Sequence, residues 1–258
     1  MHPLLFNMGP VPIHSYGLLI AIGFLSALEI IRRLSIKSKL PVDPVMDIVF
    51  WMLISGFIGA RLLFVITRFD YFAAHPLEII RVWEGGLVFF GGLITATAVF
   101  VFQMRKSKLP IWKVADVLVP GLVLNHAFGR LGCLAAGCCY GKPTDLPWGI
   151  HLHSELVERS LRGVSLHPVQ LYEAGSLLLL LFGLLWIFKH KKFDGQVGIS
   201  YFIIYPVIRS IVELFRGDFI RGFIIDPWLS TSQFISLFVV VGSLCVLLLR
   251  LKRVRAPR

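Results

Sequence analysis

Residues 170–188 read QLYEAGSLLLLLFGLLWIF, and this run of apolar side chains decides the class of fold. A helix needs about 20 mostly apolar residues to cross the hydrocarbon core of a bilayer. Other stretches of the chain are nearly as long and as apolar. The predicted spans are 16–34, 46–67, 87–104, 114–130, 170–188, 196–214 and 231–250. The sequence therefore predicts an all-α polytopic membrane protein with about seven transmembrane helices, forming a single domain over residues 1–258.

The composition supports this class. Hydrophobic residues make up 56% of the 258 residues and charged residues 16%, whereas soluble domains average roughly 45–50% and about 25%. A net charge of +11 in a soluble protein would suggest nucleic acid as a partner. Here the basic residues lie in short loops between apolar spans, a pattern typical of membrane topology and of contact with anionic lipid headgroups. We therefore expect a lipid bilayer as partner and no nucleic acid.

The basic loops also predict an orientation. Lys and Arg gather in the segments that follow the first, third, fifth and seventh predicted spans. The positive-inside rule places such loops in the cytoplasm, so we expect the N-terminus outside and the C-terminus inside. The first 15 residues hold no Lys or Arg, so the first span is not expected to be a cleaved signal peptide. The longest outer loop, 131–169, is predicted to form a small cap or an interfacial helix. The fourth span, with Pro120 inside it, is predicted to be short.

Several charged side chains fall within or beside these spans, where a charge normally pairs or lines a cavity. Arg209 and Glu213 stand four residues apart in YPVIRSIVELFRG, so they share a helix face. Arg130 lies in the glycine-rich stretch GRLGCLAAGCCYG, whose last residue, Gly141, lets a ligand approach the backbone closely. Arginine can grip phosphate at two points, although an internal ion pair or an interfacial arginine would also fit. Arg61 is equally consistent with a functional and a structural role.

A second polar group opens the fifth predicted span in HPVQLYE, residues 167–173. Polar side chains at that depth are either anchors or proton carriers. Another candidate, Arg81, precedes the third span in RVWEGG. The candidates in the HPVQLYE stretch are His167, Gln170, Tyr172 and Glu173.

Three cysteines, Cys133, Cys138 and Cys139, raise the question of metal or redox chemistry. Their C-x4-CC spacing matches no common zinc pattern, and the sequence offers no obvious fourth ligand. Adjacent cysteines also differ from the redox motif C-x-x-C. We therefore expect no metal. A disulfide on an oxidising outer face and a packing role for small side chains both stay open.

These motifs together resemble the prolipoprotein diacylglyceryl transferases, bacterial inner-membrane enzymes that lipidate lipoprotein precursors. The resemblance runs nearly from end to end and depends on the stretches in combination. They are IHSYGLL (13–19), FIGARLLFV (57–65), HPLEIIRVWEGG (75–86), GGLI (91–94), GRLGC and AGCCYGKP (129–143), HPVQLYE (167–173) and YPVIRSIVELFRGD (205–218).

The resemblance implies a reaction and its participants. The diacylglyceryl group of phosphatidylglycerol would pass to the thiol of a lipobox cysteine in a prolipoprotein, giving a thioether and glycerol 1-phosphate, with no cofactor. The family fold implies a multi-pass protein of the bacterial inner membrane with its active site toward the periplasm. The residues implied as catalytic are Tyr16, Arg130, His167, Arg209 and Glu213. Those implied to bind phosphatidylglycerol are Arg81, Arg130, Gly141, Gln170, Tyr172, Glu173 and Arg209.

The chain departs from the family pattern at the expected base. Many members carry histidine just before the Gly-Gly of the third span, where this chain has Phe90. Many also carry Asn and Glu at the positions of Cys133 and Cys138. The family's assignment of the base that deprotonates the substrate thiol therefore cannot be transferred to this chain. His14, His167 and the absence of any dedicated base stay open as alternatives.

Two other functions also fit parts of the sequence. Intramembrane charges alone would suit a membrane transporter, but the chain has no internal repeat of the kind common in transporters. Adjacent Cys138 and Cys139 would suit a membrane thiol oxidoreductase. Solute flux distinguishes the first alternative from the lipid transferase, and replacement of the cysteines distinguishes the second.

Overall fold

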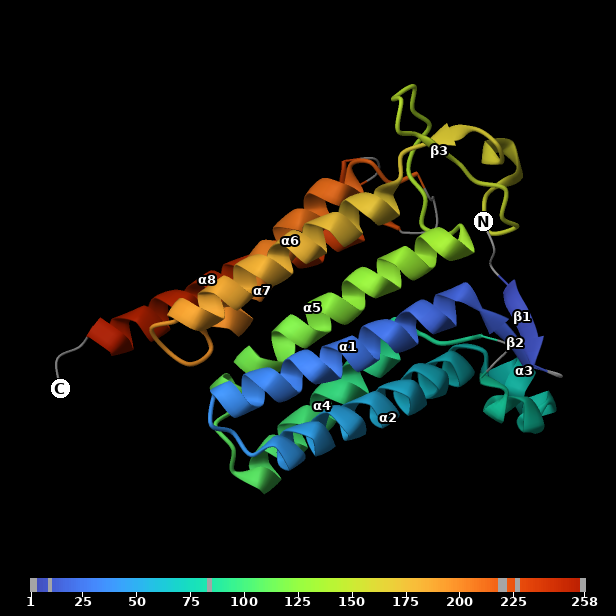
Figure 1. Ribbon diagram of the computed structural model, residues 1–258. Helices are drawn as coiled ribbons and strands as arrows, with labels where there is room; N and C mark the ends of the chain where they lie inside the picture. Colours follow the sequence, from blue (N-terminus) through green and yellow to red (C-terminus); the bar gives the residue numbers. More distant parts are fainter. Residues whose placement is uncertain (1–3, 9–10, 83–84, 218–221, 226–227, 256–258) are drawn as a thin grey trace. The chain divides into compact units, whose positions relative to one another are not determined.

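Long helices dominate the computed structural model, which describes residues 4–8, 11–82, 85–217, 222–225 and 228–255. Each of the predicted spans overlaps one of them (Figure 1). They are α1 (Ser15–Lys37), α2 (Val42–Thr67), α4 (Phe89–Ser107), α5 (Ile111–Ala136), α6 (Val169–His190), α7 (Gln196–Glu213) and α8 (Thr231–Arg255).

Short elements connect the long helices. A six-residue helix, α3 (Phe69–Ala74), and the 3-10 turn η1 (Pro76–Ile80) follow α2, and a second 3-10 turn, η3 (Arg159–Leu161), precedes α6. Three antiparallel strand pairs occur in the described residues, each of two short strands. They are β1 (Leu4–Met8) with β2 (Val11–His14), β3 (Ile150–His151) with β4 (Ser165–Leu166), and β5 (Phe223–Ile225) with β6 (Leu229–Ser230).

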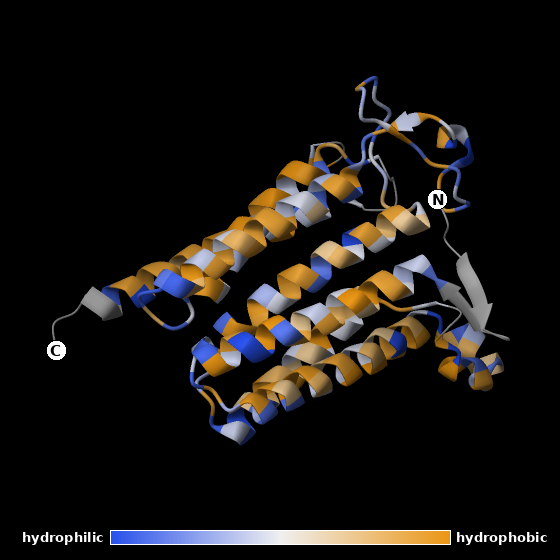
Figure 2. Ribbon diagram, in the orientation of Figure 1, coloured by the Kyte–Doolittle hydropathy of each residue, from blue (hydrophilic) through white to orange (hydrophobic). Residues whose placement is uncertain are grey.

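The long helices present apolar surface, as expected of a membrane protein. Among the described residues, α2, α5, α6 and the Thr231–Lys252 part of α8 are long and apolar enough to cross a bilayer. Large apolar side chains on their outsides are exposed, for example Leu179 and Phe182 on α6. Figure 2 shows hydrophobic residues along these helices and hydrophilic ones at the α6–α7 turn. In water such surface would be an aggregation hazard, whereas in a bilayer it faces lipid. The chain is therefore a helical membrane protein.

The chain divides into two compact units, and each is described by itself. The first consists of Met1–Ile31 and Ala115–Arg258, and the second of Arg32–Val114. In the second unit α2 and α4 pack side by side through glycines (Figure 1). A Cβ on Gly91 would collide with the carbonyl oxygen of Gly59, and the Thr95 hydroxyl donates to the carbonyl of Ser55 at 2.8 Å. Small residues let membrane helices approach this closely.

Arg61 has a structural role within that second unit. Its guanidinium, which is nearly buried, donates to the backbone carbonyls of Glu78 and Gly85 at 2.7 Å each and of Ile79 at 2.8 Å. Further contacts reach the carbonyls of Gly86 and Arg81 at 3.2 and 3.3 Å. Each carbonyl lies in the segment between α3 and α4, so Arg61 fixes the course of that segment. These contacts favour the structural alternative for Arg61.

In the first unit α5 contacts both α1 and α6. Cβ atoms on Gly23 and Gly121 would strike Phe128 and Ile31, so α1 and α5 pack closely at both positions. Helices α6 and α7 pack together, as do α7 and α8. The prediction of a short fourth helix is wrong, because α5 continues to Ala136. Its glycine-rich end stays helical where Gly132 accommodates the ring of Tyr16.

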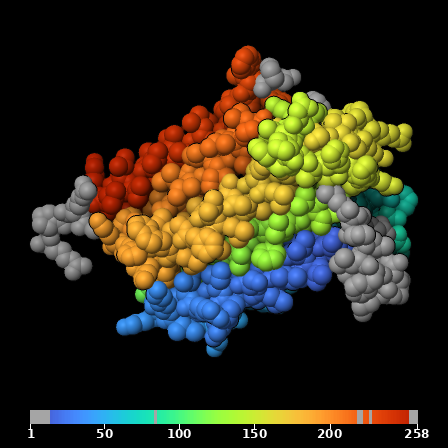
Figure 3. Space-filling view, turned by 45° about the horizontal axis from the view of Figure 1, so that its top comes forward, coloured from blue at the N-terminus to red at the C-terminus, as the bar shows by residue number. Residues whose placement is uncertain are grey.

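The segment between α5 and α6 has a small core of its own. Buried Tyr140, Leu152, Val157 and Leu166 pack together, with Ile150 and Leu161 against them. Backbone hydrogen bonds attach this segment to the end of α7, from Lys142 N to Phe215 O at 2.9 Å and from Gly217 N to Tyr140 O at 3.2 Å. Figure 3 shows it gathered at one end of α6 and α7. Residues 137–168 therefore form a compact segment, whereas residues 131–136 of the predicted 131–169 cap continue α5.

Candidate active site

Arg130 and Glu173 form a buried ion pair between α5 and α6. Arg130 Nε lies 3.0 Å from Glu173 Oε2, and the Glu173 side chain is only 1% exposed. The Nε–H is not aligned on the carboxylate, so the contact is an ion pair without a well-formed hydrogen bond. A carboxylate this far from solvent requires a compensating charge. Two sequence-predicted residues, 43 positions apart, are thereby brought together.

His126 and Tyr205 complete the surroundings of Glu173. His126 Nε2 lies 3.8 Å from Glu173 Oε1, and the Tyr205 hydroxyl donates to the same oxygen at 3.2 Å. The His126 and Tyr205 rings meet edge to face at 5.1 Å between centroids, and Tyr205 stacks on Tyr201. Helices α5, α6 and α7 therefore converge on one carboxylate. His126 was not singled out from the sequence, although it stands four residues before Arg130, just as Tyr205 stands four before Arg209 on the polar face of α7.

Arg209 and Glu213 pair along α7, as their spacing predicts. Arg209 Nη1 lies 2.6 Å from Glu213 Oε2, and both side chains are largely buried, at 13% and 3% exposure. Arg209 also interacts electrostatically with His126 and Tyr205. The second arginine thus belongs to the same polar cluster as Arg130. We call His126, Arg130, Glu173, Tyr205, Arg209 and Glu213 the arginine cluster.

His167 and Tyr172 lie in an aromatic group at the start of α6. His167 Nδ1 is 3.2 Å from the Tyr172 hydroxyl, which also accepts a hydrogen bond from Trp148 Nε1 at 2.8 Å. The Phe215 ring lies edge to face against both His167 and Tyr172. Gly141 lies beneath His167, because a Cβ at Gly141 would come 2.5 Å from His167 Cβ. Gly141 therefore positions the histidine through close backbone packing.

Gln170 and Tyr16 lie beside the three cysteines. The buried Gln170 amide donates from Nε2 to the carbonyl of Cys138 at 2.7 Å. Tyr16, in the first turn of α1, interacts electrostatically with all three cysteines. The Sγ atoms of Cys133, Cys138 and Cys139 lie within 4.8 Å of one another. Hydrogen bonds from Cys133 and Cys138 lower the pKa of the Cys139 thiol, and the charges of Arg130 and Arg216 act in the same direction.

Two positions discussed from the sequence fall in the second unit. Arg81 forms an ion pair with Glu78, with Nη1 3.5 Å from Oε1. Phe90 lies in the first turn of α4, and its ring is exposed. Trp83 and Glu84 of the RVWEGG stretch and Asp218 of the RGD end lie outside the described residues. Arg81 therefore stays a prediction as a substrate ligand.

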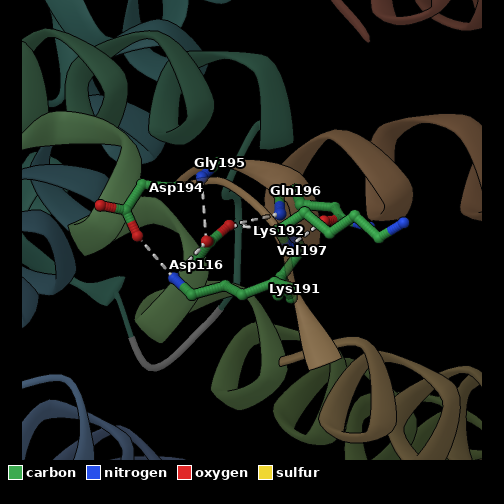
Figure 4. Close-up of polar contacts among 8 residues, drawn as sticks. Asp116, Lys191, Lys192, Asp194, Gly195, Gln196 and Val197 are labelled. Carbon is green, nitrogen blue, oxygen red and sulfur yellow. Dashed lines mark hydrogen bonds and ion pairs between the residues drawn. The ribbon is translucent and has the colours of Figure 1, made fainter. Parts of the chain in front are cut away.

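A second buried carboxylate, Asp116, lies near the start of α5 and is fully occupied (Figure 4). Its oxygens accept from the backbone N–H groups of Gly195, Val197 and Gly198 at 2.9–3.0 Å and from Lys191 Nζ at 2.8 Å. Asp116 thus caps the N-terminus of α7, where a negative charge is favourable. Burial disfavours the charged Lys191, but its bonds to Asp116 and Asp194 prevail and raise the pKa of Lys191. This arrangement is structural.

The fold and the arginine cluster define a helical integral membrane protein with buried arginines, each paired with a glutamate. The family model for prolipoprotein diacylglyceryl transferase matches residues 3–249. The chain belongs to this family of transferase enzymes.

Individual relatives agree with the family model. The chain is 37% identical to the phosphatidylglycerol–prolipoprotein diacylglyceryl transferase of Clostridium tetani, over 93% of the chain and 94% of the relative. It is 31% identical to the enzyme of that name from Finegoldia magna, over 94% of the chain and 93% of the relative. The one from Bordetella parapertussis is 34% identical, over 88% and 89%. The similarity therefore extends over most of the length of these relatives.

Proposed function

We propose that the chain transfers the diacylglyceryl group of phosphatidylglycerol to the lipobox cysteine thiol of a prolipoprotein. The product is a thioether, and glycerol 1-phosphate leaves. Family membership and the names of the relatives support the reaction and its two substrates. The observation that carries the proposal to particular residues is the arginine cluster, with Arg130 Nε 3.0 Å from Glu173 and Arg209 Nη1 2.6 Å from Glu213.

The chemistry requires positive charge at the leaving group. The substrate thiolate attacks the glycerol carbon that carries the phosphate ester, and the departing phosphate monoester gains negative charge. Preorganised cations in a poorly hydrated site stabilise such charge more strongly than water does. In this proposal Arg130 and Arg209 hold the phosphate, while Glu173 and Glu213 orient them. The same substrate site includes Tyr16, Gly141, His167, Gln170 and Tyr172, and Arg81 is a further candidate ligand of phosphatidylglycerol.

We further propose a seven-span topology with the N-terminus outside and the C-terminus inside. Seven helices lie where spans are predicted, and the basic loops alternate as the positive-inside rule requires. The location is then the bacterial inner membrane, with residues 131–169 as a periplasmic cap. Arg130 directly precedes that segment and His167 lies near its end, so we place the arginine cluster toward the periplasmic side, where the prolipoprotein cysteine arrives. Family membership does not support the transporter alternative.

The test uses purified enzyme, phosphatidylglycerol and a lipobox peptide. We expect Arg130→Ala and Arg209→Ala each to lower transfer by roughly 100-fold or more, the cost of removing one electrostatic group from a preorganised site. Arg105→Ala is the matched control, because Arg105 is an exposed arginine in the last turn of α4. Full activity of both cluster variants would overturn the proposal, and Arg209-dependent solute flux into proteoliposomes would favour a transporter.

A further inference from the structure

Three thiols converge at the end of α5. Cys133 lies in the last turn of that helix, and Cys138 and Cys139 follow it directly. Their Sγ atoms lie within 4.8 Å of one another, each cysteine is half-buried, and all three are free thiols. We call this group the thiol cluster.

The backbone holds the thiol cluster in place before any ligand arrives. The Cys133 carbonyl accepts from Gly137 N at 2.9 Å and Cys138 N at 3.0 Å, which closes the helix end. Cys139 adopts a left-handed conformation with φ of 58°. For a residue other than glycine this backbone conformation is strained, so the surroundings must hold Cys139 in it. The Gln170 side-chain amide donates a hydrogen bond to the Cys138 carbonyl and so holds this turn of backbone.

The geometry suits a zinc ion with one open position. Zinc–thiolate bonds of about 2.3 Å in a tetrahedron place sulfurs roughly 3.8 Å apart, so small side-chain rotations suffice. Catalytic zinc sites have three protein ligands and leave the fourth position to water or substrate. Within the described residues the group holds three cysteines and no further histidine or carboxylate. A set of three soft ligands selects zinc over magnesium or calcium.

The thiol cluster borders the proposed active site. Cys133 follows Arg130 by three residues on α5, so the two lie on neighbouring turns of one helix face. Both Arg130 and Arg216 interact electrostatically with Cys139. Gln170 contacts Cys138, and the Tyr16 ring lies against Gly132. An ion at the cluster would therefore face the place where a thiol must meet a phosphate ester.

We propose that Cys133, Cys138 and Cys139 bind a Zn²⁺ ion whose fourth ligand is the thiolate of the substrate cysteine. The inference rests on the proposed transfer of a diacylglyceryl group to a thiol. That reaction needs a thiolate, and Phe90 stands where many family members have a histidine. A zinc ion supplies the activation instead, because a thiol that coordinates a metal is deprotonated.

The step balances without a redox partner. The substrate thiol gives its proton to water as its sulfur binds zinc. The zinc-bound sulfur donates an electron pair to the glycerol carbon and forms the C–S bond. The C–O bond to phosphate breaks, and its electron pair leaves with glycerol 1-phosphate toward Arg130 and Arg209. The neutral thioether is a weaker zinc ligand than a thiolate and dissociates.

Metal binding is tested first, on the full-length enzyme in detergent. We expect one Zn²⁺ per chain by mass spectrometry of metals, and a thiolate-to-Co²⁺ absorption band on replacement by Co²⁺. Each of Cys133→Ser, Cys138→Ser and Cys139→Ser is expected to lose the ion and the band. Cys245→Ser is the control, since Cys245 is an exposed cysteine on α8. Retention of the ion in the triple serine variant, or a disulfide within the cluster of the active enzyme, would overturn the proposal.

The fourth ligand is tested with peptides. A lipobox peptide should shift the Co²⁺ spectrum, whereas the same peptide with serine for cysteine should not. Metal removal should lower transfer by about 100-fold or more, the contribution of a lost thiol-activating group, and added Zn²⁺ should restore it. These measurements on wild-type protein do not depend on the folding of any variant. Full transfer by metal-free enzyme, or an unchanged spectrum, overturns the zinc site and leaves the proposed function intact. Zinc binding without transfer to any lipobox peptide overturns the proposed function instead.

Discussion

Arg61 and Arg130 are both largely buried arginines in apolar helices, yet their surroundings differ. Arg61 reaches five backbone carbonyls, which occupy all three guanidinium nitrogens. Arg130 instead forms an ion pair with a side chain, with Nε 3.0 Å from Glu173 Oε2. A guanidinium whose donors all end on its own backbone has nothing left for a ligand. One that is paired with a carboxylate side chain is oriented, and its remaining donors suit an anionic ligand.

The two buried carboxylates repeat this contrast within the first unit. Asp116 receives three backbone N–H groups and Lys191, and so completes a helix end. Glu173 instead lies against three side chains: the Arg130 guanidinium, the His126 ring and the Tyr205 hydroxyl. A buried charged side chain whose partners are mostly backbone groups therefore has a structural role. One whose partners are other side chains belongs to the candidate site.

The largest effect is expected on the stability of the protein when Arg61 is replaced. Arg61→Leu leaves several buried carbonyls without a donor, so the free energy of unfolding should fall by about 3–5 kcal/mol. Thermal and denaturant unfolding in detergent measure this loss. Arg68→Leu, an exposed arginine just past the end of α2, should change stability by less than about 1 kcal/mol. An Arg61 variant that unfolds like wild type but does not transfer would place Arg61 in the site.

The second largest effect is expected at Glu173, the partner of Arg130. Glu173→Gln keeps the shape of the side chain but removes the charge that holds Arg130. Misplacement of a positioning group by about 1 Å can cost roughly 100-fold in rate, and we expect a loss of that order in transfer to a lipobox peptide. Glu155→Gln, an exposed carboxylate of the cap, is the matched control and should retain wild-type activity. Equal losses in the two variants would contradict the role of Glu173.

A smaller effect is expected at Tyr205. Tyr205→Phe removes the 3.2 Å hydrogen bond to Glu173 and keeps the ring stacked on Tyr201. One hydrogen bond is worth about 1 kcal/mol, so transfer should fall by roughly fivefold. Tyr201→Phe keeps the same stacking and should change activity little. If both variants lose activity alike, the rings and not the hydroxyl are what matter.

The smallest effect concerns the pH dependence of the stability that Lys191, the partner of Asp116, contributes. Because the pKa of Lys191 is raised in the folded protein, the charged lysine stabilises the native state. That contribution is complete below the ordinary lysine pKa of about 10.4 and is lost as pH rises through the higher folded value. The melting temperature should therefore fall above about pH 10.5 in wild type and less in Lys191→Met. Solvent screening keeps the effect small, and parallel profiles would contradict it.

The sequence gives good guidance wherever the information is local. Apolar runs predict the helices, and the four-residue spacing of Arg209 and Glu213 predicts their pairing. Contacts between distant residues could not be predicted in this way. His126 was overlooked because its partner Glu173 lies on another helix, and the length of α5 was underestimated because its glycines pack against α1.

The sequence alone determined a helical membrane protein, its family and the arginines of its candidate site, because apolar length and motif order are properties of the chain itself. Only the tertiary structure decided which charged side chains have structural partners and which are available for the proposed chemistry. Arg61, equivocal in the sequence, is occupied by carbonyls of a later segment, and Cys133, Cys138 and Cys139 become one cluster only where the end of α5 reverses. The physical reason is that hydrogen bonds and metal ligation depend on distances of a few ångströms, which packing between helices sets.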